Sequence, residues 1–146
     1  MAEEANETQE LELRPEEHDW FLGVLVGLAN HGTSIGITLQ VGGFLVSGTL
    51  IGGAEYFEGF ASEFSSMFDK KEVAEGFRTA IAAGADHYKN IPEGEESLAS
   101  YVHLKEARFF NTHGKPIPAN RGVWWRGRLS EVSGFILGSL SHDEEA

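Results

Sequence analysis

Residues 34–53, SIGITLQVGGFLVSGTLIGG, constrain the fold more than any other segment of this chain, because their pattern suits a β-hairpin. Apolar residues alternate with small or polar ones over residues 35–41, which is the period of a strand with one buried face. The glycines at 42–43 can take positive φ at no steric cost, as a two-residue hairpin turn requires. We therefore predict two antiparallel strands, the second over residues 44–51.

A helix is predicted before this hairpin, from Pro15 to Gly32. Proline suits the first helical turn, acidic residues follow it near the positive end of the helix dipole, and glycine is a common stop. Helical spacing places four apolar residues on one face, which we expect to pack on the sheet: Phe21, Val24, Leu25 and Leu28.

Residues 54–90 change to a helical period and are predicted to be an insertion between the second and third strands. Phenylalanines recur every three or four positions from Phe57 to Phe68, and Asp69 with Glu72 resembles a capping pair that starts a second helix. Apolar stripes of this kind are usually buried on folding, so we expect this one in the core.

Three more strands are predicted in the last third of the chain. Residues 101–110 are the third strand, and residues 123–132 and 134–140 are the fourth and fifth, joined by a tight turn at residues 133–134. The segment between them, residues 111–122, contains two prolines and two glycines and is expected to be an exposed loop without regular structure.

The expected fold is α+β. A small, strongly bent antiparallel sheet of five strands, or a barrel, follows an N-terminal helix and carries the helical insertion between strands two and three. We expect residues 15–141 to form a single domain between two acidic tails, a flexible one at residues 1–14 and a short one at residues 142–146.

Composition narrows the class of protein. The chain has no cysteine, which excludes disulfides, thiolate metal sites and a cysteine nucleophile. The longest apolar run, residues 20–29, is shorter than the roughly 20 residues of a membrane-spanning helix, so we expect no membrane anchor. The N-terminus is acidic where a secretion signal is basic, which predicts a cytoplasmic protein.

Charge is distributed unevenly. The net charge is −12, yet residues 101–141 carry six Lys or Arg against only Glu106 and Glu131. Residues 1–17 and 54–100 are the acidic zones. Scattered charges that keep the protein soluble are one interpretation, and charge-driven self-association is the other.

No catalytic or metal-binding motif is found. The six histidines form no HxxxH, HxH or HExxH pattern, the glycine-rich hairpin has neither P-loop nor dinucleotide spacing, and Ser47 lacks the GxSxG context of a nucleophile. Glu106 and Glu131 are expected to pair with Arg108, Arg126 or Arg128 across the sheet.

Binding of single-stranded RNA is the alternative function. Aromatic residues lie near arginines in the last third of the chain, and such sites combine stacking with positive charge. LQVGGFLVSGTL also looks like the first signature of Sm-like RNA-binding barrels, whereas RGRLSEV departs from the second. The strongly negative net charge makes nucleic acid an unlikely partner.

Three ordered blocks of the chain resemble the gas vesicle accessory protein family GvpU. They are the SGTLI segment followed by EYF, the YVHLK strand, and WRGRLSEVSGFILG, within a likeness that spans about residues 20–141. The resemblance implies a non-enzymatic protein without a cofactor, which acts on gas vesicles by governing their assembly or clustering.

Clustering of particles implies many weak contacts, so we expect self-association and contact with the vesicle shell or other gas vesicle proteins. Basic strands would meet acidic tails or helices of neighbouring copies, or the tails would instead limit growth by repulsion. The residues predicted to form the interaction site are Arg108, Phe109, Trp124, Trp125, Arg126 and Arg128.

Overall fold

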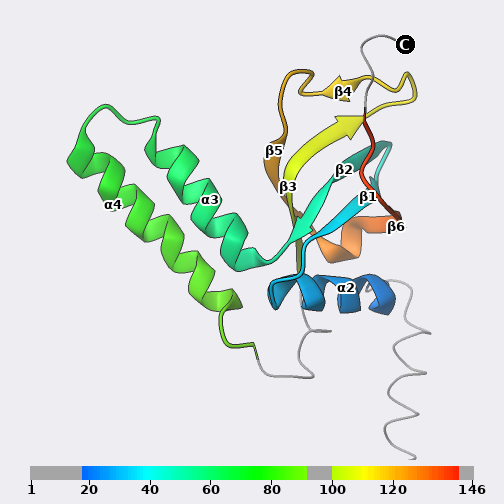
Figure 1. The fold of residues 1–146 in the computed structure, drawn as a ribbon, viewed down its shortest axis with the longest axis horizontal. Helices are drawn as coiled ribbons and strands as arrows, with labels where there is room; N and C mark the ends of the chain where they lie inside the picture. The colour runs from blue at the N-terminus through cyan, green and yellow to red at the C-terminus, as the bar shows by residue number, and fades with distance from the viewer. Residues whose placement is uncertain (1–17, 92–99, 142–146) are drawn as a thin grey trace, which may run out of the picture.

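The computed structural model describes residues 18–91 and 100–141 (Figure 1). Both predicted tails and the start of the first helix at Pro15 lie largely outside these residues. In chain order the elements are α2 (Trp20–Asn30), β1 (Ile35–Val41), β2 (Phe44–Ile51), α3 (Gly53–Ser65), α4 (Lys71–Ala82), the 3-10 helix η1 (Ala83–Tyr88), β3 (Tyr101–Phe110), β4 (Pro116–Ile117), β5 (Val123–Arg128), the 3-10 turn η3 (Leu129–Glu131) and β6 (Val132–Leu137). None of these helices combines the length and apolar character that crossing a membrane requires.

The fold is α+β, as predicted, with the N-terminal helix and the insertion in the expected places. Its antiparallel sheet has the strand order β4-β3-β2-β1-β6, with β5 also beside β3, and it is open rather than closed into a barrel. The first hairpin is confirmed in full register, from the Ile35–Leu50 pair to the Val41–Phe44 pair, and Gly42 takes a φ of +59° in its turn.

The sixth strand is β4, and it corrects the prediction that residues 111–122 have no regular structure. Pro116 and Ile117 pair with Phe110 and Phe109 at the edge of the sheet. A proline is tolerated there because an edge strand need not use every N–H group in a ladder.

The predicted hairpin between the last two strands is wrong. Residues 133–134 lie inside β6, and the chain turns earlier, at η3. Leu129 in that turn is completely buried, so the chain passes through the core instead of reversing on itself. As a result β5 pairs with β3 while β6 pairs with β1, at the other edge of the sheet.

Helix α2 packs on the sheet, but by a different face from the predicted one. Asp19 caps it by accepting a hydrogen bond from the Phe21 backbone N–H at 2.9 Å. Of the four residues expected to face inward, only Leu25 packs against the core; Phe21, Val24 and Leu28 are 50%, 42% and 47% exposed. The helix is apolar on nearly all sides, so the helical period of its sequence does not identify the buried face. The buried residues are Leu22, Gly23, Val26, Gly27 and Ala29, and the small ones among them allow α2 to lie close to the sheet.

The core fills the space between α2 and one face of the sheet. Leu22 and Val26 of the helix meet apolar residues of four strands, among them Leu39, Leu50 and Leu104, which are completely buried. The opposite face of the sheet carries the insertion, α3 to η1, which projects away from the strands as two antiparallel helices (Figure 1).

Gly48 allows β2 and β3 to approach each other where their ladder shifts register. A Cβ at this position would lie 2.8 Å from the Lys105 carbonyl oxygen and 3.0 Å from the Ala107 Cα. Both neighbours are backbone atoms, so they cannot rotate away.

We expect Gly48→Ala to lower the free energy of unfolding by about 1–3 kcal/mol, because the added methyl group forces two paired strands apart. Gly43→Ala is the matched control, since nothing lies within 4 Å of a Cβ there. Urea denaturation of both variants measures the difference. Equal stability of the two variants would show that the close approach at Gly48 is not required.

Candidate interaction surfaces

Arg126 on β5 is held between aromatic rings where the insertion meets the sheet. Its Cζ lies 3.8 Å from the ring centre of Tyr101 and 5.2 Å from that of Phe57. One guanidinium nitrogen donates to the Tyr88 hydroxyl at 3.0 Å and lies 2.8 Å from Nε2 of His103. These five residues are called the Arg126 cluster below.

Nε2 of His103 accepts the hydrogen bond from Arg126, because a guanidinium group can only donate. The side chain is 1% exposed, and burial together with the positive charge of Arg126 lowers its pKa to about 3, from an ordinary value of 6.5. The imidazole is therefore neutral at physiological pH. The ring of Tyr56 lies beside it, tilted by 39° with ring centres 4.8 Å apart, and burial raises the pKa of the Tyr56 hydroxyl.

The Arg126 cluster joins the insertion to the sheet. Phe57 lies on α3 and Tyr88 on η1, whereas Tyr101 and His103 lie on β3. Cation–π contacts and hydrogen bonds between elements this far apart in the chain fix the base of the insertion against the strands.

Trp124 reinforces the same junction. Its ring occupies the space that a Cβ on Gly59 of α3 would need. Lys105 on β3 also lies 3.4 Å from a carboxylate oxygen of Glu55 on α3. These contacts add packing and an ion pair between α3 and the strands at the junction.

The six residues predicted to form one interaction site do not lie on one surface. Phe109 and Trp125 pack against the core, and Trp124 and Arg126 belong to the junction with the insertion. The other two are Arg108, which lines a pocket, and Arg128, which is exposed at the end of β5. Arg128 is exposed, and the other five are half-buried.

The predicted ion pairs are replaced by others. Within the described part of the chain, neither Glu106 nor Glu131 pairs with a neighbouring arginine. The basic strands instead use the acidic helix α3, where Lys105 meets Glu55 and Arg121 lies 3.3 Å from Glu63. Both pairs are solvent-exposed and contribute little to stability.

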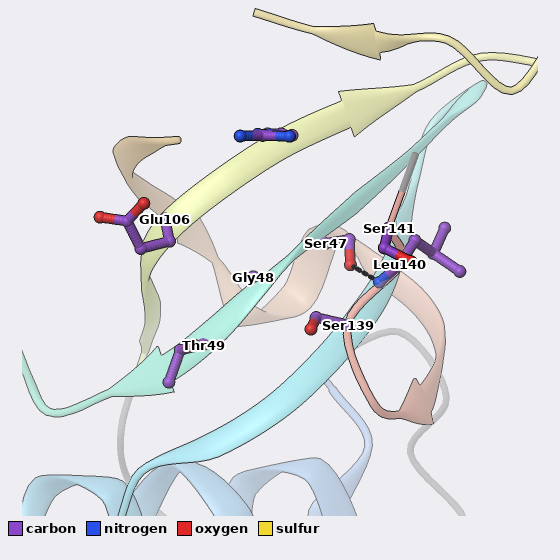
Figure 2. A pocket seen from close by; sticks show the side chains of 8 residues that line it. Ser47, Gly48, Thr49, Glu106, Ser139, Leu140 and Ser141 are labelled. Atoms are coloured by element: carbon purple, nitrogen blue, oxygen red, sulfur yellow. Dashed lines mark hydrogen bonds between the residues drawn. The ribbon is translucent and has the colours of Figure 1, made fainter. Parts of the chain in front are cut away.

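A polar pocket of about 250 Å³ lies on the sheet face beside Arg108 and Glu106 (Figure 2). Thr38 donates to the Gly138 carbonyl at 2.8 Å, so Ser47 must donate to Thr38, 3.0 Å away, and it accepts from the Leu140 N–H at 2.6 Å. The hydroxyl groups are therefore satisfied by one another. They clamp the segment after β6 onto the sheet, which is a structural role.

Apart from Phe44, Leu45, Ile117 and Leu140, the exposed large apolar side chains of the described residues lie in two places. The first, the arm surface, lies on the insertion, where the phenylalanine stripe forms a seam between α3 and α4 rather than part of the main core. Phe64 and Phe68 contact Phe77 with ring centres 5.8 and 4.8 Å apart, yet α4 has no buried residue. The arm surface comprises Phe60, Met67, Val73 and Phe77, which are 36%, 71%, 40% and 44% exposed.

The second, the β6–α2 surface, combines the outer face of α2 with the neighbouring edge strand. Phe21 of the helix and Phe135 of β6 are in contact, with ring centres 5.8 Å apart. The β6–α2 surface comprises Trp20, Phe21, Val24, Leu28, Ile136 and Leu137, all at least 41% exposed. Figure 1 places β6 and the tip of the insertion far apart on the molecule.

Sequence analysis missed the Arg126 cluster. Tyr101 and His103 alternate onto one face of the predicted third strand, so the sequence places them side by side. Their partner could not be identified, because the register between β3 and β5 is set by packing and not by local pattern.

The buried neutral histidine makes stability depend on pH. Its pKa is lower in the folded protein than in the unfolded chain, so the unfolded chain binds the extra proton between pH 6.5 and about 3. We expect stability to fall with decreasing pH through this range, by up to about 1.4 kcal/mol per pH unit.

His103→Gln keeps a hydrogen-bond acceptor for Arg126 but does not titrate. Urea denaturation from pH 7.5 down to pH 4.5 should therefore show a shallower loss of stability in this variant than in the wild type. Parallel curves for the two proteins would show that His103 is not the buried neutral group.

Comparison with known proteins identifies a family. The family model described as gas vesicle protein GvpU-like matches residues 19–140, which include every element from α2 to β6. No curated protein and no solved structure gives a match. Because the family model covers most of the chain, this protein belongs to the GvpU-like family of gas vesicle proteins.

Proposed function

We propose that this protein is a non-enzymatic, cytoplasmic accessory protein that governs the assembly or clustering of gas vesicles through self-association and contact with the vesicle. The observation that supports it most directly is the presence of two separate apolar surfaces on one small protein. Monomeric proteins rarely expose large apolar patches without an interaction to serve.

Two separate surfaces suit a protein that links particles. If one contact holds another copy and the other holds the vesicle shell or another gas vesicle protein, each bound copy raises the effective concentration of the next. Weak contacts then suffice, and the assembly can grow or dissolve with small changes in conditions.

Charge is the second component of the proposal. Three of the six cations in residues 101–141 are already engaged inside the molecule: Lys105, Arg121 and Arg126. Arg108, Lys115 and Arg128 have no ion pair within the described part of the chain. These three are the groups that would meet acidic zones of neighbouring copies, and such contacts weaken with salt.

Flotation tests this proposal, since gas vesicles are buoyant. Purified protein is mixed with isolated gas vesicles, and the fraction that rises with them is measured across a salt series, with single-stranded RNA binding measured in parallel. We expect protein in the floating layer, less of it at high salt, and no RNA binding. Absence from that layer at every salt concentration would contradict the proposal.

Arg128→Glu tests the charge component. It reverses an exposed, unpaired cation of the basic strands and should reduce flotation severalfold at low salt. Arg78→Glu on α4 changes the net charge equally at another exposed cation and should stay close to the wild type. If flotation falls equally in both variants, the effect comes from net charge and not from Arg128. If it falls in neither, charge has no part in the mechanism.

A further inference from the structure

Strand β6 leaves one edge of the sheet open. Among the described residues it pairs only with β1, so the N–H and C=O groups of its outer edge have no strand beside them. Natural proteins protect such edges with charged side chains, prolines or bulges, because an open edge is a template for another strand.

The two edges of this sheet differ in the residues that protect an edge strand from pairing. The far edge carries Pro116 in β4 and the exposed Arg128 in β5, which are typical protective residues. The β6 sequence, VSGFIL, has no charged residue and no proline; its ladder with β1 shifts register at Ser133, and residues 134–137 after this shift pair regularly. Of the two edges, β6 is the one suited to pair with another strand.

Apolar side chains extend this edge on both faces of the sheet. Leu137 lies opposite Ile37 of the core face, and Ile136 opposite Thr38 of the other face; they are 69% and 59% exposed. On the core face the apolar area continues through Phe21 onto α2, and Ile136 is the one member of the β6–α2 surface on the other face. Its six side chains expose on the order of 600 Å².

From these observations we infer that a second copy of this chain binds here, with β6 of each copy pairing antiparallel to β6 of the other and the outer faces of α2 packing alongside. Such a two-fold contact brings the same surface together from both sides. Every β6 residue would then meet an uncharged residue, and the α2 helices, WFLGVLVGLAN, bring no charge to the contact.

The area also fits a dimer. A standard interface buries about 800 Å² per partner, and the strand backbone adds to the roughly 600 Å² of apolar side chains. Pairing of β6 with the far edge of another copy is less favourable, because it would place apolar side chains beside Arg128 and a strand beside Pro116, which has no N–H to donate. The inference specifies the self-association in the proposed function and does not depend on vesicle contact.

Leu137→Lys tests the inference without disturbing the core, since the side chain is largely exposed. Lysine on an edge strand prevents pairing, so we expect at least a tenfold weaker dimer by sedimentation velocity. Met67→Lys on the arm surface is the matched control, because Met67 is apolar and 71% exposed, and it should remain dimeric. Monomeric wild type at tens of micromolar, or a dimer equally strong in Leu137→Lys, would overturn the inference.

Disulfide trapping tests the pairing mode, because the chain has no cysteine of its own. Single cysteines placed in turn at residues 133–137 should give a disulfide-linked dimer at one or more positions, since a two-fold axis brings equivalent residues together. Thr79→Cys, exposed on α4, should not. Larger rings with no β6 cross-link would overturn the two-fold contact in favour of a head-to-tail one.

The two proposals can fail separately. A wild-type monomer that still floats with gas vesicles would remove the β6 dimer and leave the proposed function standing. If the wild type dimerises, Leu137→Lys does not, and neither floats with vesicles, the β6 dimer stands and the proposed function is contradicted.

Discussion

A positive charge held between aromatic rings fixes the position of the helical insertion relative to the sheet. Arg126 reaches from β5 to Tyr88 of η1, and its ring partners come from β3 and α3. The guanidinium can be held there because His103 stays neutral and accepts its hydrogen bond. Without this contact the insertion would be held by the packing of Tyr56 and Trp124 and by exposed ion pairs, which contribute little.

Fixing the insertion also separates the two apolar surfaces. The arm surface projects on one side of the molecule, and the β6–α2 surface lies on the other (Figure 1). A protein with both surfaces on one face could bind a single large partner. Two separate surfaces instead suit a protein that connects two partners, which is the property that clustering requires.

Local pattern predicted the parts of this fold that local physics determines. The alternation and the Gly-Gly turn fixed the first hairpin, and the helical period located the insertion. The helix face was wrong because α2 is apolar on nearly all sides, and the last hairpin was wrong because burial of Leu129 determines where the chain turns. Neither effect leaves a periodic signal, since both depend on which distant surfaces meet.

The positions of the predicted site residues also depend on contacts between distant parts of the chain. Arginines and aromatic residues of β3 and β5 were predicted to be an interaction site, which stays a prediction; in the structure Trp125 packs against the core and Arg126 contacts the insertion. The side chains left accessible were ones that sequence reasoning had assigned to the core, such as Phe21, Val24 and Leu28. An apolar residue counts as a core residue in any sequence pattern until the structure shows that nothing covers it.

The size of gas vesicle clusters as purified protein is added tests the central claim most directly. If the protein bridges vesicles through multivalent contacts, the mean cluster size measured by light scattering should rise with the protein-to-vesicle ratio and fall again when excess protein saturates every vesicle separately. A cluster size that stays constant at every ratio would contradict the account.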